Sequence, residues 1–164
     1  MKISLATAVS ITDLSENTLR RRIAQGIMTR TIEEGSNGRS MIPFDILKAE
    51  CCFPLNDDDL TLIKEADQGI SEAQNDLALL FLSHKKPRKA IYWLKLAIKQ
   101  QNKDAMHWLG RCYIEGNGIA PDENLGLMWL AKAAAEGHFI SREMMQSIRQ
   151  KIISGPKVPS INSF

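Results

Sequence analysis

Cysteine is scarce in this sequence, with three copies among 164 residues. Cys51 and Cys52 are adjacent and Cys112 falls inside a predicted helix, so these positions do not suit a disulfide framework and we expect reduced thiols. Long hydrophobic runs are also absent, because no apolar stretch approaches the roughly 20 residues that a membrane helix needs. These shortages exclude a disulfide-stapled scaffold and a membrane-spanning protein.

An excess of charge of either sign is missing as well. The net charge is only +2, which gives no general argument for nucleic-acid binding, so such binding has to rest on local patches. A short apolar run over residues 3–9 follows Lys2 and is similar to a secretory signal. It contains Ser4 and Thr7 and is soon followed by three arginines, so export is an alternative that the sequence disfavours. We expect a cytoplasmic protein.

Clusters of chemically reactive residues are absent too. His84, His107 and His138 have no cysteine or carboxylate at ligand spacing, so we expect neither a metal site nor a cofactor. The acidic run 57–59 has an alternative interpretation as a metal cluster. Three acids just before Leu60 are better explained by the helix dipole, which favours negative charge at a helix N-terminus. No catalytic constellation is recognisable, and we expect no enzymatic activity.

Small, aromatic and glycine residues recur between positions 105 and 137 in the pattern of a packed helical hairpin. A first helix presents an apolar face with a glycine beside it, and a second helix presents the answering face. The first face comprises Ala105, Leu109, Gly110 and Tyr113, the second comprises Trp129 and Ala133, and the turn between them contains Gly116 and Gly118. We predict two antiparallel helices.

The same frame occurs once more upstream, which indicates a repeat. Residues 73–81 precede 105–113 by 32 positions (105 − 73), and residues 90–97 precede 126–133 by 36 (126 − 90). Self-similarity at this period is typical of a stacked helical solenoid. The pattern resembles the Sel1-like repeat family, a relative of tetratricopeptide repeats. An earlier, truncated unit precedes residue 70. Together, the repeats imply an α-α solenoid of about two and a half helical hairpins.

The first fifty residues follow a different pattern of short helices and turn signals. The expected elements are a helix over residues 5–12, a second helix capped by Ser15 and closed by Gly26, two strands within 27–32 and 40–42, and a third helix opened by Pro43. This order predicts a small winged helix-turn-helix domain with a β-hairpin wing. The whole chain is then mainly α-helical.

These residues resemble the MerR and excisionase-like DNA-binding families. The resemblance is carried by Leu14-Ser15, Thr18-Leu19-Arg20, Gly26, Arg39, Ile42-Pro43 and Ile46-Leu47. It implies that the second helix enters the major groove of double-stranded DNA, where one face can read base edges and hold phosphates. The predicted DNA-binding residues are Asn17, Thr18, Arg20, Arg21, Arg22 and Arg39. The alternative is that the arginines form an ordinary solvated helix face.

The residues left over from the buried face of each repeat form a second stripe on the two first helices. Stacked, these stripes would make a shallow groove that accepts a peptide or helix of a protein partner. The predicted partner-binding residues are Glu72, Asn75, Leu79, Leu82, Asp104, His107, Arg111 and Ile114. The alternative is a vacant groove in repeats that only pair the DNA-binding domains as a homodimer.

We therefore predict a bacterial cytoplasmic regulator that binds double-stranded DNA at one end and a protein at the other. Its expected parts are a DNA-binding domain at 1–50, a linker at 51–59, a solenoid at 60–152 and a disordered tail at 153–164. The rival interpretation is an adaptor that binds no DNA and uses the first domain to dock a protein, because the fold alone does not decide between these functions.

Overall fold

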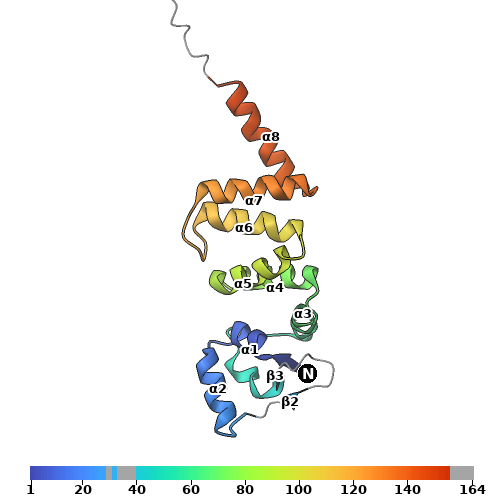
Figure 1. Cartoon of the computed structure of the whole chain (residues 1–164), viewed down its shortest axis with the longest axis vertical. Helices are drawn as coiled ribbons and strands as arrows, with labels where there is room; N and C mark the ends of the chain where they lie inside the picture. The colour runs from blue at the N-terminus through green and yellow to red at the C-terminus, as the bar shows by residue number, and fades with distance from the viewer. Residues whose placement is uncertain (29–30, 33–39, 156–164) are drawn as a thin grey trace, which may run out of the picture.

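The computed structural model describes residues 1–28, 31–32 and 40–155, and Figure 1 shows them as an elongated stack of layers. The head, residues 1–55, forms one end. It contains β1 (Lys2–Ser4), α1 (Leu5–Ile11), α2 (Glu16–Ala24), β2 (Thr31–Ile32), β3 (Ser40–Pro43) and the 3-10 turns η1 (Phe44–Ile46) and η2 (Lys48–Glu50). The repeat stack follows with α3 (Asp57–Asp67), α4 (Ser71–Ser83), α5 (Pro87–Ile98), α6 (Lys103–Glu115), α7 (Glu123–Ala135) and α8 (Phe139–Ile153).

The first two helices of the head lie where the sequence predicted them, and the second has the predicted cap. Ser15 is the N-cap of α2, and its hydroxyl oxygen accepts a hydrogen bond from the Thr18 backbone N–H at 3.1 Å. Leu19 is fully buried on the inner side of α2. Gly26 ends the segment with a φ of +71°, a conformation that glycine adopts without steric cost.

The three strands form an antiparallel sheet in the order β1-β3-β2. The sequence pattern did not reveal β1, because a strand of three residues is too short to show an alternating pattern. Its central residue Ile3 pairs with Ile42 and both are fully buried. The expected Asn37-Gly38 turn lies outside the described residues.

The predicted third helix of the head is wrong, since residues 44–50 form two successive 3-10 turns. A 3-10 turn aligns residues three positions apart, which lets Phe44 and Leu47 both point into the core. The chain then pairs Cys51 with Thr12 in an isolated β-bridge. Tertiary packing against α1 therefore replaces the regular helix.

The repeats form two helical hairpins, α4–α5 and α6–α7, as predicted. In the second hairpin the helices approach closely at two glycines, because a Cβ atom on Gly110 would lie 2.9 Å from the Gly126 carbonyl oxygen. Gly116 ends α6 in the left-handed conformation with a φ of +65°. In the first hairpin Lys85 adopts this conformation instead, with a φ of +56°, and Pro87 opens α5.

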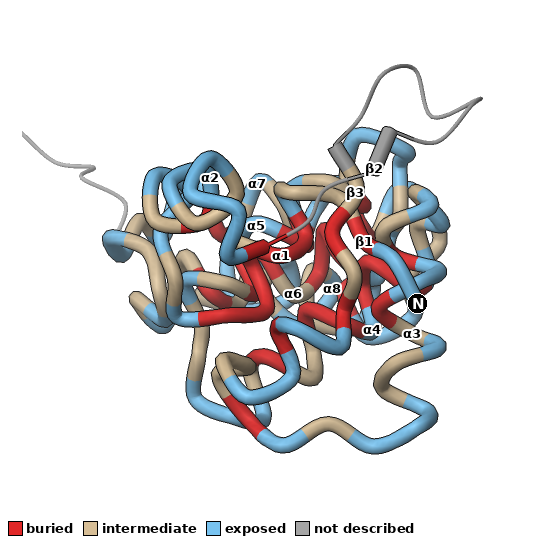
Figure 2. Tube along the Cα trace, turned by 90° about the horizontal axis from the view of Figure 1, so that it is seen from below, coloured by how far each residue is buried: buried red, intermediate tan, exposed pale blue. Residues whose placement is uncertain are grey.

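The head and the repeat stack share one continuous hydrophobic core. Figure 2 shows the buried segments of the chain in red. Within residues 51–59, which we expected to be a linker, Phe53 belongs to this core, and Cys51, Cys52 and Leu55 pack against it. Phe53 is buried, with its ring edge-on to Phe81 at 5.3 Å and stacked on His84 at 4.2 Å. Helix α3 already begins at Asp57, capped by Asn56. The head is therefore packed on the first repeat and not tethered to it.

Candidate functional site

Helix α2 carries the predicted DNA-binding residues on the side of the head that faces away from the core. Asn17, Arg20 and Arg21 are exposed, and Thr18 is half-buried. Arg39 lies outside the described residues. The exposed face of α2 is thus available to a ligand, as the helical spacing predicted.

Two of the three arginines on this helix already have carboxylate partners. Arg20 Nη2 lies 2.6 Å from Glu16 Oε1, one helical turn earlier, and Arg22 Nη1 lies 2.9 Å from Glu50 Oε1. Each guanidinium would have to leave its partner to hold a phosphate, so neither is preorganised as a phosphate clamp. The Arg21 side chain forms no ion pair or hydrogen bond with the residues that the structure describes.

A carboxylate at the end of α3 binds the beginning of α1. Asp67 Oδ1 accepts hydrogen bonds from the hydroxyls of Ser4 and Thr7, both at 2.5 Å, and Oδ2 accepts one from the Ser4 backbone N–H at 3.0 Å. Ser4 is the N-cap of α1, where the helix dipole favours a negative charge. Asp67 therefore joins the repeat stack to the head.

A lysine of α5 binds the other end of the same helix. Lys89 Nζ donates hydrogen bonds to the backbone oxygens of Ser10, at 2.9 Å, and of Thr12. These carbonyls lie at the C-terminus of α1, where a cation is favoured. Asp13 adds ion pairs with Lys86 Nζ at 3.4 Å and Lys89 Nζ at 3.8 Å. Local sequence patterns could not predict the contacts of Asp67 and Lys89 with α1, because these contacts join residues sixty or more positions apart.

The predicted partner-binding stripe is only partly accessible. Glu72, Asp104 and Ile114 are exposed, and Leu79, Leu82 and Arg111 are half-buried. Asn75 and His107 are both buried, with exposed fractions of 5% and 4%, so the expectation that these two positions are free is wrong. Helix α8 packs against this face of α6 and covers His107.

A buried polar cluster joins α6 to α8 at this point. His107 Nδ1 lies 2.8 Å from Ser141 Oγ, and the His107 ring is stacked on His138 at 4.3 Å. His138 caps α8 through its Nδ1, which accepts a hydrogen bond from the Ser141 N–H, and its Nε2 lies 3.6 Å from Asp104 Oδ1. Ser141 is fully buried, so its contact with His107 is structural. The sequence spacing did not reveal that two histidines meet here.

Acid should weaken this cluster. Burial, followed by the neighbouring His138 and Arg111, lowers the pKa of His107 to about 4 from an ordinary value near 6.5. The unfolded chain therefore binds more protons between these two pH values, and the free energy of unfolding falls as the pH drops from about 6.5 to about 4, by at most about 1.4 kcal/mol per pH unit.

Urea unfolding of the full chain across this pH range measures the effect. His107→Gln removes the titrating group, so its stability should depend less on pH than that of the wild type. The two proteins have all other side chains in common, so the contributions of those side chains to the pH dependence cancel in the difference. Equal pH dependence of the two proteins would contradict the assignment.

The described residues contain neither a membrane-spanning helix nor a metal-ligand cluster. No helix among them combines the length and apolar character needed to cross a bilayer. Within the same residues, no three or more histidine, cysteine or acidic side chains gather as ligands for a metal ion. The cysteines at 51, 52 and 112 are free thiols.

Comparison with known families identifies the repeat stack. The family model for the Sel1 repeat matches residues 71–102 and 103–138. These two matches contain the hairpins α4–α5 and α6–α7. The repeat stack therefore belongs to the Sel1 repeat family, as the spacing of the small residues predicted. The match does not include the head.

Two curated relatives and two solved structures are similar to the chain. Both relatives are called DAP3-binding cell death enhancer 1, from Rattus norvegicus (29% identical over 121 residues) and Mus musculus (30% over 100 residues). They match 64% and 59% of this chain, which spans only 24% and 20% of their length.

A Sel1 repeat protein from Oxalobacter formigenes is 30% identical, with a TM-score of 0.51 over 56% of this chain and 74% of its own. The Escherichia coli protective antigen c5321 is 24% identical, also with a TM-score of 0.51, over 56% of this chain and 21% of its own, and supports the fold alone.

Proposed function

We propose that this chain is a cytoplasmic, non-enzymatic adaptor, in which a Sel1 repeat stack and a head packed on it present one surface to a protein partner. The observation that carries this proposal is the junction. Asp67 and Lys89 bind the two ends of α1, and the core runs through both parts. A head held in this way has a fixed orientation relative to the repeats, as an extended docking surface requires.

The relatives support a protein partner as the class of ligand. The rat and mouse relatives are named for binding to DAP3. Because the chain spans about a quarter or less of their length, only this class carries over and not the particular partner. Within the repeats, the accessible members of the predicted stripe remain a candidate surface: Glu72, Leu79, Leu82, Asp104, Arg111 and Ile114.

A DNA-binding regulator is the second candidate, favoured by one observation on α2. Arg21 is exposed and has no partner among the described residues, and Asn17 lies one helical turn before it. In that function the two side chains would read bases, and two copies of the chain would bind two half-sites as a homodimer. The carboxylate partners of Arg20 and Arg22 and the net charge of only +2 count against it.

Binding to labelled duplex DNA of mixed sequence separates the two functions. Phosphate contacts impose a steep loss of affinity between about 50 and 200 mM salt. The adaptor proposal expects no such binding. The regulator expects tight, salt-sensitive binding that Arg21→Ala weakens by about 1 to 3 kcal/mol. Glu65→Ala, on the exposed side of α3, serves as the control variant, and binding lost only in Arg21→Ala would overturn the adaptor proposal.

A further inference from the structure

Three hollows lie end to end along α5 and share lining residues. The first, of about 640 Å³, lies between the N-terminus of α5 and the α6–α7 loop. The second, of about 500 Å³, shares Arg88 and Lys89 with it and lies beside α1. The third, of about 520 Å³, shares Ala6 and Tyr92 with the second and ends between α1 and α3. Together they form one groove, here called the junction groove.

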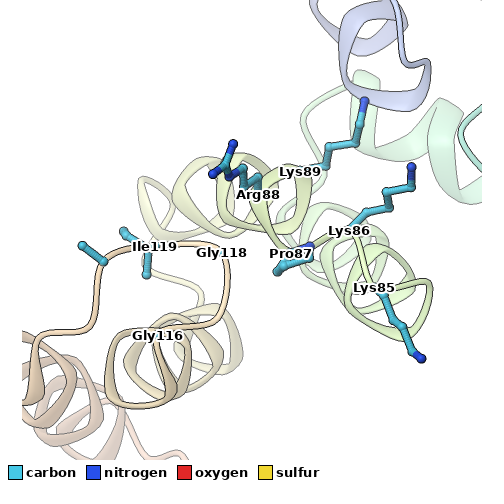
Figure 3. Close-up of a pocket in the computed structure, with 9 residues that line it drawn as sticks. Lys85, Lys86, Pro87, Arg88, Lys89, Gly116, Gly118 and Ile119 are labelled. Carbon is cyan, nitrogen blue, oxygen red and sulfur yellow. The ribbon is translucent and has the colours of Figure 1, made fainter.

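The first hollow is basic. Lys85, Lys86, Arg88 and Lys89 line it together with the glycine loop, and no acidic residue does. The loop approaches closely because Gly118 has no side chain, since a Cβ atom there would lie 2.6 Å from the Pro87 carbonyl carbon. Figure 3 shows Lys86 and Lys89 extending to the same side, whereas Lys85 and Arg88 point away from each other.

Only two of these four cations are available to a ligand. Lys86 and Lys89 are bound to Asp13 and to the end of α1. Lys85 and Arg88 are exposed and have no ion pair within the described part of the chain. Two free cations match one or two carboxylates. They are too few for the row of phosphates that a nucleic acid presents.

The second hollow is mainly apolar beyond Arg88. Val9 and Leu14 of the head line it opposite Tyr92, which is 39% exposed. A half-exposed aromatic ring in a concave, apolar surface suits an aromatic or aliphatic side chain of a ligand. The head thus supplies one wall of the groove and α5 supplies the other.

The third hollow has a polar lining whose groups are bonded within the chain. Gln74, Asp67 and the Glu16–Arg20 ion pair line it, and Trp93 forms part of its wall. The Trp93 indole N–H is buried and has no acceptor among the described residues, which is uncommon for a buried donor. Because this N–H is not accessible from the hollow, the third hollow extends the groove without adding a contact that selects the ligand.

We propose that the junction groove binds an extended segment of the partner protein, with acidic residues at Lys85 and Arg88 and an aromatic or aliphatic anchor at Tyr92. This proposal rests on the adaptor function and specifies its binding surface. The charge of the first hollow and the apolar lining of the second select this occupant. A vesicle surface is too flat to enter a groove between two packed parts of the chain.

Selection of a phage-displayed random peptide library on the full chain tests the proposal. Enriched peptides should carry acidic residues beside an aromatic or aliphatic residue. For a synthetic peptide of the enriched sequence, Arg88→Glu should weaken binding by about tenfold or more, and Tyr92→Ser should weaken it as well. Lys95→Glu makes the same charge change on α5 outside the groove and should leave affinity unchanged.

Other results would overturn the proposal in distinguishable ways. Peptides that are insensitive to Arg88→Glu but lost in Leu79→Asp with Arg111→Glu would place the site on the first helices, and the adaptor function would stand. No enriched peptide would contradict both the groove and the adaptor. Binding of a short single-stranded RNA or of phosphatidylserine vesicles that Arg88→Glu abolishes would assign the groove to another ligand. Circular dichroism verifies that each variant folds, and Arg88→Ala replaces Arg88→Glu if it does not.

Discussion

Gly110→Leu is expected to destabilise the repeat stack by about 3 kcal/mol. The reason is the closeness of α6 and α7, where a Cβ atom on Gly110 would meet the Gly126 carbonyl oxygen at 2.9 Å and Leu130 Cγ at 3.0 Å. Neither the carbonyl nor a fully buried leucine can move aside easily. A leucine side chain therefore forces the two helices apart and opens the core around them.

Urea unfolding followed by circular dichroism measures this loss. Gly110→Ala should fall between the wild type and Gly110→Leu. Ala131→Leu adds a side chain of the same size to an exposed position of α7 and should change stability little. An unchanged unfolding transition for Gly110→Leu would mean that the helices pack in another way.

Asp67→Ala is expected to loosen the head from the repeats, at a cost of about 3 kcal/mol. It removes the acceptor for three hydrogen bonds, from the Ser4 N–H and the hydroxyls of Ser4 and Thr7. Thr7 is buried, with 2% of its surface exposed, so its hydroxyl would lose the carboxylate acceptor away from water and keep only the contact with Ser4 Oγ at 3.2 Å. The N-cap of α1 would also lose the adjacent negative charge.

Hydrogen exchange localises the effect. Backbone amides of α1 should lose protection in Asp67→Ala, while those of α7 should keep it. Glu65→Ala removes an exposed carboxylate from the same helix and provides the matched control. If α1 remained as protected in Asp67→Ala as in the control, the polar junction would contribute nothing to holding the head.

Local sequence patterns determined much of the fold. Helical periodicity and capping residues gave the positions of α1, α2 and the repeat hairpins, because each depends on residues within a few positions of one another. The close approach at Gly110 was predictable for the same reason. A glycine beside an apolar stripe allows a second helix to pack closely on that face. The next helix along the chain is the one expected to do so.

The candidate site depended more on contacts between distant residues, which local sequence patterns do not reveal. The spacing on α2 correctly placed Asn17 and Arg21 at the surface, but it could not indicate that Arg22 pairs with Glu50, twenty-eight positions away. His107 was assigned to the surface because one repeat alone leaves it uncovered. It is buried because α8 covers it.

By itself, the sequence determined that this chain is a mainly helical stack of Sel1 repeats preceded by a different, compact segment. Only the tertiary structure decided that this segment is packed on the stack, with Asp67 and Lys89 at the two ends of α1 and the junction groove between them. The physical reason is how far apart along the chain the interacting residues lie. Helices and their turns are set by neighbours along the chain, whereas burial and ion pairing between distant segments are set by which surfaces meet when the chain folds.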